Sequence, residues 1–113
     1  MVPNRKTLAG LVSAAVMLAA TGAVAQDRDR ELRGKEIAEA ACSPCHAIGK
    51  QGASPNPASP PFRTLGQKYP VESLEEALAE GILVGHPGMP QVRMSPEDIG
   101  AFLAYLKTVQ VEK

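Results

Sequence analysis

The last part of the chain carries apolar residues at the spacing of an α-helix. Ser95, followed by Pro96 and two acidic residues, is a typical helix start, because serine caps free backbone N–H groups and proline suits the first turn. We therefore expect a final helix over residues 95–109 with one buried face. The apolar positions, at i, i+3, i+4 and i+7, are Ile99, Phe102, Leu103 and Leu106, with Tyr105 beside them.

An earlier helix is expected over residues 29–42, after a polar and frayed segment at residues 26–30. Its apolar period is imperfect, and Gly34 in its interior costs about 1 kcal/mol relative to alanine. Such a glycine indicates the close approach of another backbone or of a bulky ring. The candidates for the buried side of this helix are Leu32, Ile37, Ala38 and Ala41.

The middle of the chain predicts a short helix over residues 73–80. Its first residues have the spacing of a capping box, with Ser73 at the N-cap and Glu76 three positions later, and Gly81 is a typical helix end. The acidic residues of this helix are interpreted as its solvent-exposed face. Its apolar positions include Leu74 and Leu78.

Two segments rich in proline and glycine, at residues 47–59 and 85–90, are expected to be loops. Between them, Phe62 and Leu65 are expected in the core, and their spacing does not decide whether that core faces a cofactor. No segment shows the alternation that predicts a strand. The pattern therefore indicates an all-α fold with three main helices.

The N-terminal residues 1–25 have the features of a secretory signal peptide. Arg5 and Lys6 form a charged region, an apolar run follows, and Ala23-Val24-Ala25 is a typical cleavage site. The apolar run is shorter than the roughly 20 residues that a membrane span needs. We therefore expect residues 26–113 to form one exported domain in the periplasm without stable membrane insertion, and an uncleaved anchor is the alternative.

Composition narrows the classes of protein that this chain can represent. It has no tryptophan, two tyrosines and two phenylalanines, so the aromatic material for a core is scarce. A domain of this size needs an additional source of stability, which a buried cofactor would supply. Removal of the signal takes away Arg5 and Lys6 and no acid, and the slightly acidic remainder argues against binding of nucleic acid or of an anionic membrane.

The stretch Cys42-Ser43-Pro44-Cys45-His46 matches the pattern for covalent attachment of haem c. Two cysteines are needed because haem has two vinyl groups, and His46 then falls under the iron as the proximal ligand. The alternatives are a surface disulfide, a dithiol redox pair and half of a zinc site. A thioredoxin-like pair would need a βαβ setting, and a zinc site would need two further ligands at paired spacing.

The sixth coordination position of the iron decides what such a protein can do. Met89 is the first candidate, because it stands between Gly88 and Pro90 in a stiff loop where a thioether has no evident packing role. The alternatives are Met94, His86 and an open site.

With these features in order, the sequence resembles a small class I cytochrome c of the bacterial exported type with a single haem. The resemblance covers about residues 29–110 and implies the cytochrome c fold, with helices wrapped around one covalently bound haem. It implies Met89 as the distal ligand and the Pro60 carbonyl as the acceptor for the second N–H of His46. It also implies contact of Gly34 with Phe102 or Tyr105. The candidate cofactor-binding residues are Cys42, Cys45, Pro60, Phe62, Leu74 and Leu78, and the candidate metal ligands are His46 and Met89.

The chain departs from the family pattern at the haem propionates. It has no tryptophan to bond a propionate, and Ser59 stands where a glycine usually precedes the proline. Tyr69 is a weak candidate for a propionate contact.

The function implied by the resemblance is electron transfer and not enzyme catalysis. The expected partners are redox proteins: a respiratory dehydrogenase or a quinol-oxidising complex as donor, and a terminal acceptor. We expect a monomer. The alternatives are a gas-binding or peroxidase-like haem protein, a fixed haem c subunit of a larger oxidoreductase, and a dithiol protein without haem.

Overall fold

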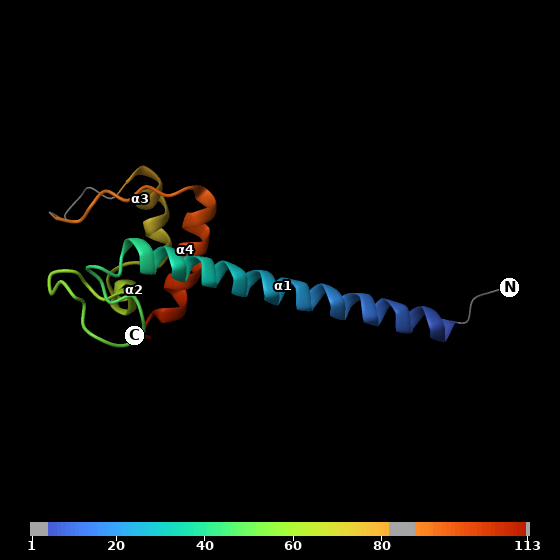
Figure 1. Ribbon diagram of the computed structural model, residues 1–113. Helices are drawn as coiled ribbons and strands as arrows, with labels where there is room; N and C mark the ends of the chain where they lie inside the picture. Colours follow the sequence, from blue (N-terminus) through green and yellow to red (C-terminus); the bar gives the residue numbers. More distant parts are fainter. Residues whose placement is uncertain (1–4, 82–87, 113) are drawn as a thin grey trace.

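The computed structural model describes residues 5–81 and 88–112, with side chains from residue 20 onward. Its regular elements are all helical within this part of the chain, so the expected all-α class is confirmed (Figure 1). In chain order they are α1 (Arg5–Ala41), the 3₁₀ turn η1 (Phe62–Thr64), α2 (Leu65–Lys68), the 3₁₀ turn η2 (Val71–Ser73), α3 (Leu74–Glu80) and α4 (Pro96–Val109).

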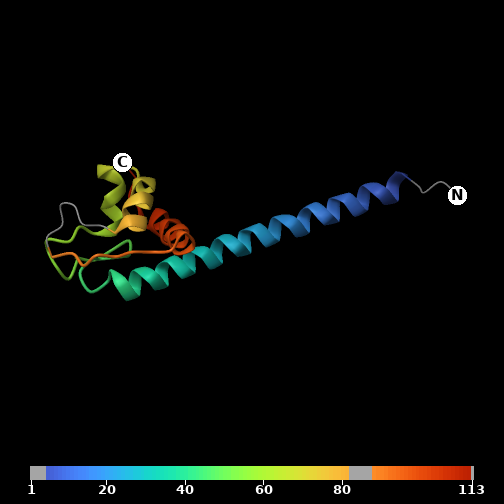
Figure 2. The same cartoon turned by 90° about the horizontal axis from the view of Figure 1, so that it is seen from above.

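The helix α1, with 37 residues, is the longest of the described elements. Its C-terminal part packs against α4, and its N-terminal part projects away from the other helices (Figures 1 and 2). Residues 20–30 are all exposed, so contact with the body begins close to residue 31. In the described part of the chain, no helix is both long enough and apolar enough to cross a membrane.

The start of α1 differs from the expectation. The sequence predicts a helix from residue 29 after a frayed segment, whereas the structure has one continuous helix from Arg5 through that segment. The reason is local, because α1 contains no proline and is rich in alanine, leucine, arginine and glutamate, which favour helix.

Two residues expected on the buried side of α1 are exposed, since Leu32 keeps 60% of its surface accessible and Ala41 is also exposed. The buried stripe is narrower than expected and centres on Gly34 and Ala38, with Ile37 packed at its margin.

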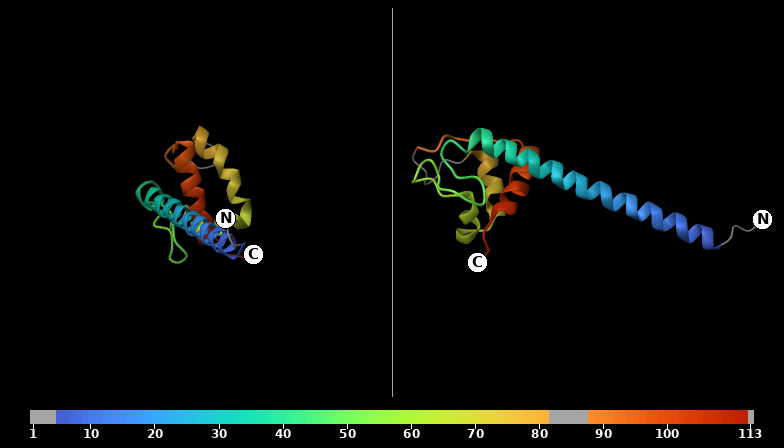
Figure 3. Two further views of the ribbon diagram at one scale, coloured as in Figure 1. Left: turned by 90° about the vertical axis from the view of Figure 1, so that its right-hand side faces the viewer. Right: turned by 60° about the horizontal axis from the view of Figure 1, so that its bottom comes forward.

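The helix α1 crosses α4, as the end view in Figure 3 illustrates. Gly34 lies at this crossing, next to Ala101 and Tyr105 of α4. A Cβ atom at this position would overlap the backbone carbonyl group of Ala101 and would lie 2.7 Å from the Cβ of Tyr105. The expected contact of this glycine with an aromatic residue of the last helix is therefore confirmed, with Tyr105 as the partner. Only a residue without a side chain allows the two backbones to approach this closely.

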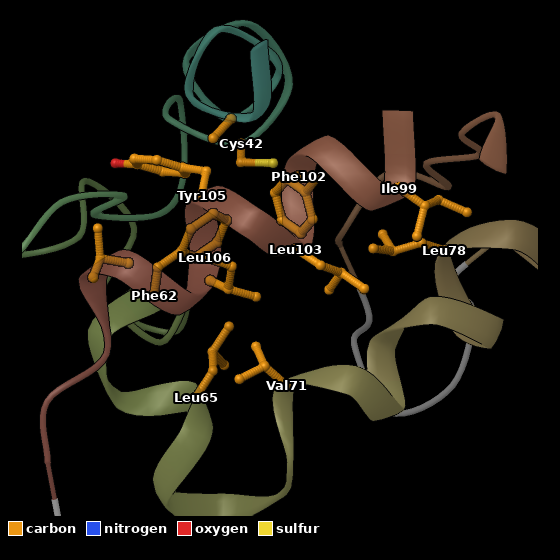
Figure 4. Close-up of a cluster of buried hydrophobic side chains, with 12 residues drawn as sticks. Cys42, Phe62, Leu65, Val71, Leu78, Ile99, Phe102, Leu103, Tyr105 and Leu106 are labelled. Atoms are coloured by element: carbon orange, nitrogen blue, oxygen red, sulfur yellow. The ribbon is translucent and has the colours of Figure 1, made fainter. Parts of the chain in front are cut away.

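The helix α4 forms the centre of the core (Figure 4). Leu106 is fully buried, and the ring of Phe102 meets the ring of Phe62 edge to face, with centroids 5.7 Å apart. The expected final helix is confirmed with its buried face. The buried residues of α4 are Ile99, Ala101, Phe102, Leu103, Tyr105, Leu106 and Val109.

The N-terminus of α4 is capped as the sequence predicts. The hydroxyl of Ser95 accepts a hydrogen bond from the backbone N–H of Asp98 at 3.2 Å, and Pro96 occupies the first turn. Replacing Ser95 by alanine should lower the free energy of unfolding by about 1 kcal/mol, because this N–H loses its partner. Equilibrium denaturation measures the change. A Ser95→Ala protein as stable as the wild type would contradict the cap.

The capping box expected at the start of α3 is not formed. Ser73 has helical backbone angles (φ −62°, ψ −15°), and its side chain makes no capping hydrogen bond. The turn η2 takes its place, because the N–H of Leu74 already bonds to the carbonyls of Val71 and Glu72. The expected end of the helix at Gly81 is confirmed, with a positive φ of 92° that suits glycine.

Candidate functional site

A cavity of about 860 Å³ opens between the C-terminal end of α1, the segment around η1, the helix α3 and residues 88–94. Its volume lies in the range of roughly 300–1,000 Å³ that is typical of ligand sites. Every cofactor-binding and metal-ligating residue expected from the sequence lines this one cavity. These residues are Cys42, Cys45, His46, Pro60, Phe62, Leu74, Leu78 and Met89.

The cysteine and histidine side chains reach the cavity because the motif continues the end of α1 as a series of turns. The N–H of Cys42 bonds to the carbonyl of Ala38 at 2.9 Å, and the N–H groups of Cys45 and His46 bond back to the carbonyl of Cys42 at 3.1 and 2.9 Å. These turns place Cys42, Cys45 and His46 together in the lining of the cavity. The two cysteines are not bonded to each other.

The thiol of Cys42 is buried. Burial raises the pKa of Cys42 to about 11 because the thiolate loses its hydration. Cysteines that serve as dithiol redox catalysts usually have a lowered pKa, since the thiolate is the nucleophile. The environment of Cys42 therefore speaks against the dithiol alternative. The zinc alternative lacks support too, because the described residues contain no cluster of three or more histidine, cysteine, aspartate or glutamate ligands.

His46 is held in one orientation by the chain. Its Nδ1 lies 2.8 Å from the carbonyl oxygen of Pro60, and because a carbonyl can only accept, Nδ1 carries the proton. The ring also contacts Phe62, with centroids 5.3 Å apart. The hydrogen bond expected between His46 and the carbonyl of Pro60 is therefore present. It leaves Nε2 as the nitrogen available to a metal.

The helix α4 supports the loop that follows His46. The hydroxyl of Tyr105 donates a hydrogen bond to the carbonyl of Ile48 at 2.8 Å. Desolvation, together with the nearby charge of Glu39, raises the pKa of Tyr105, so the hydroxyl keeps the proton that it donates. The Cβ of Tyr105 thus lies at the crossing of α1 and α4, and its hydroxyl bonds to the loop after His46.

Two methionines also line the cavity. Met89 is half-buried and follows Gly88, whose φ of 93° forms the turn before it. Met94 also lines the cavity, but it packs against the hydrophobic core, and its N–H donates to the carbonyl of Leu78 at 3.2 Å. Among the described residues, Met94 therefore packs against the core and Met89 does not. His86, the third candidate, lies outside the described residues.

The apolar wall of the cavity comes from buried side chains of η1 and α3, chiefly Phe62 and Leu78. Tyr69 and Ser59 also line the cavity, and Tyr69 is partly exposed. Sequence reasoning missed Val92. The signal was present, because Val92 and Met94 alternate with exposed Gln91 and Arg93, as expected of an extended segment with one face inward.

The residues around this cavity fit a covalently attached haem. Two thiols, one orientated imidazole and two thioethers, of Met89 and Met94, include the donors that hold and ligate haem c, and the lining is mainly apolar. The family model described as cytochrome c matches residues 32–110. Comparison with curated proteins and with solved structures gave no significant match.

Proposed function

The chain belongs to the cytochrome c family, and from this premise we propose that it is an exported carrier of single electrons with a His/Met-ligated haem. Membership in the family means that the protein carries covalently attached haem c and exchanges electrons with redox partners. The observation that carries the finer proposal is the common cavity of Cys42, Cys45, His46 and Met89.

Each of these side chains has a proposed task. Cys42 and Cys45 would hold the haem through thioether bonds, and His46 and Met89 would bind the iron from its two sides. When bound, the haem supplies a centre that takes up and releases one electron. The Pro60 carbonyl orients His46 through Nδ1, and the apolar wall keeps water from the centre. If His46 and Met89 both bind the iron, no position would be left for a substrate, so we propose a carrier and not an enzyme.

We also propose the cellular setting. The signal-like residues 1–25 support export to the periplasm, where a respiratory dehydrogenase or a quinol-oxidising complex would donate the electron and a terminal acceptor would receive it. The mature chain would be a monomer that does not stay inserted in the membrane. A gas-binding haem protein is the second candidate, and it requires that Met89 does not hold the sixth position.

The covalent link is tested by mass. Protein expressed with the haem-attachment machinery and purified from the periplasm should have the mass of residues 26–113 plus one haem, and should keep the haem through acid-acetone extraction. The double variant Cys42→Ala, Cys45→Ala should release all of its haem, because neither thioether can form. Ser43→Ala, inside the same motif, is the matched control and should retain it. Extractable haem in the wild type would contradict the proposal.

A further inference from the structure

Gln110 follows the last residue of α4, and its side-chain amide reaches back to the segment that lines the cavity. Its Nε2 donates to the carbonyl of Phe62 at 2.8 Å and to the carbonyl of Leu106 at 2.9 Å. Its Oε1 accepts from the backbone N–H of Gly66 at 2.7 Å. This is the only orientation that satisfies all three groups, because the carbonyls can only accept and the N–H can only donate.

Phe62 and Gly66 are four positions apart, which is the separation of hydrogen-bonded partners in an α-helix. The carbonyl oxygen of Phe62 accepts hydrogen bonds from the N–H of Leu65 and from the side chain of Gln110. These two bonds occupy both lone pairs of that oxygen. The N–H of Gly66 bonds to Gln110 instead of Phe62. The amide of Gln110 is therefore inserted into the helical ladder. Such an insertion interrupts a helix, and the segment divides here into η1 and α2.

Gly66 makes this insertion possible. A Cβ atom at position 66 would lie 2.9 Å from the Oε1 of Gln110, so a side chain there would press on the amide. The next residue adds a second connection, since the N–H of Val111 donates to the carbonyl of Arg63 at 3.0 Å. The end of the chain thus holds the junction between η1 and α2 at two adjacent places.

The segment that Gln110 holds is the one that holds His46. The N–H of Phe62 donates to the carbonyl of Ala47 at 2.9 Å, and the carbonyl of Pro60 accepts from the Nδ1 of His46 at 2.8 Å. Two consecutive prolines at 60 and 61 make the connection stiff. A displacement of the Phe62 backbone therefore also displaces the carbonyl of Pro60.

We propose that Gln110 is a positioning residue for His46, acting through the place of the Pro60 carbonyl. The inference rests on the proposed function, in which His46 is an axial ligand. A hydrogen bond at Nδ1 raises the basicity of a metal-ligating imidazole. A more basic ligand favours the oxidised iron, so a weaker bond to Pro60 raises the reduction potential.

The first test replaces Gln110 by leucine in the haem-loaded protein. The ladder between Phe62 and Gly66 can then close, and the Pro60 carbonyl shifts. We expect the Nδ1–H of His46 to exchange with solvent about tenfold faster than in the wild type, a ratio that corresponds to about 1.4 kcal/mol. Proton NMR of the reduced protein measures this exchange rate. The reduction potential, measured by redox titration, should rise. Gln67→Leu is the matched control, because Gln67 is exposed on α2 beside Gly66, and it should change neither value.

The second test uses Gly66→Ala, which displaces the amide by contact and leaves Gln110 in the chain. It should give the same two changes as Gln110→Leu. Added to Gln110→Leu, it should give no further change in exchange or potential, because the amide is already absent. If Gln110→Leu fails to fold, Gly66→Ala alone decides the question.

The positioning role would be overturned if the folded variants kept the wild-type exchange rate of the His46 Nδ1–H and the wild-type reduction potential, even if they were less stable. A separate variant tests the premise. If His46→Ala keeps the low-spin spectrum of the wild type, the proposed ligand set is wrong, whatever the Gln110 variants show.

Discussion

In the proposed ligand set, replacing Met89 by alanine should open the sixth position of the iron. Three changes should occur together. The weak red absorption band of ferric haem with a methionine ligand should vanish, the reduction potential should fall, and the ferrous protein should bind carbon monoxide. The physical reason is common to all three, because methionine opposite histidine raises the potential and blocks the sixth position. Optical titration under carbon monoxide and redox titration measure them.

Met94→Ala is the matched control for this experiment. Met94 lines the same cavity but packs against the core, so its loss should reduce stability without opening the iron. If Met94→Ala abolishes the band and Met89→Ala preserves it, the ligand is Met94 and the carrier proposal stands with a different residue. If the wild-type ferrous protein binds carbon monoxide readily at neutral pH, the gas-binding function becomes the better one.

Replacing Gly34 by alanine should lower the free energy of unfolding by about 3 kcal/mol, the upper part of the usual range for overpacking. The added methyl group would meet the carbonyl group of Ala101 and the Cβ of Tyr105. Both contacts are close to the backbone of α4, so no side-chain rotation relieves them, and the two helices must separate. The measurement is denaturant unfolding of the haem-loaded protein, followed by far-UV circular dichroism.

The control for Gly34→Ala is the same change at Gly100. This glycine also lies in a helix beside the crossing, but an added Cβ would meet only the far end of the Arg30 side chain, at 3.0 Å. That side chain can move, so Gly100→Ala should raise stability by up to about 1 kcal/mol through helix propensity. Equal effects at the two positions would show that the close crossing of α1 and α4 does not limit stability.

The parts of the fold that could be predicted depend on neighbours in sequence. The helix α4 has its cap, its proline and its apolar face within one segment, and each of these signals agrees with the others. The motif from Cys42 to His46 is likewise local, because the attachment of haem needs those residue types at that spacing. The candidate site residues do gather at one cavity, and their individual roles stay predictions.

Two differences from the expectation are local. The capping box at Ser73 is replaced by the turn η2, and α1 continues through the segment expected to be frayed. The other parts that could not be predicted depend on distant partners. Leu32 has the residue type of a core position, yet the crossing with α4 is too narrow to cover it. Gln110 gives no signal in the sequence, because its partners Phe62 and Gly66 are 48 and 44 positions away.

The pairing of α1 with α4 bears on when the protein can fold. These two helices make the most extensive contact among the described elements. The guanidinium of Arg33 donates a hydrogen bond to the carboxylate of Asp98, which lies 65 positions later in the sequence. Closing so long a loop is slow compared with forming local structure. The interface cannot form until α4 has reached α1, so the segment from Cys42 to His46, which lies earlier in the chain, does not depend on it for its local turns. The order of the elements thus places the attachment motif ahead of the helix that closes the core, and the two parts of the site become joined only in the last step of folding.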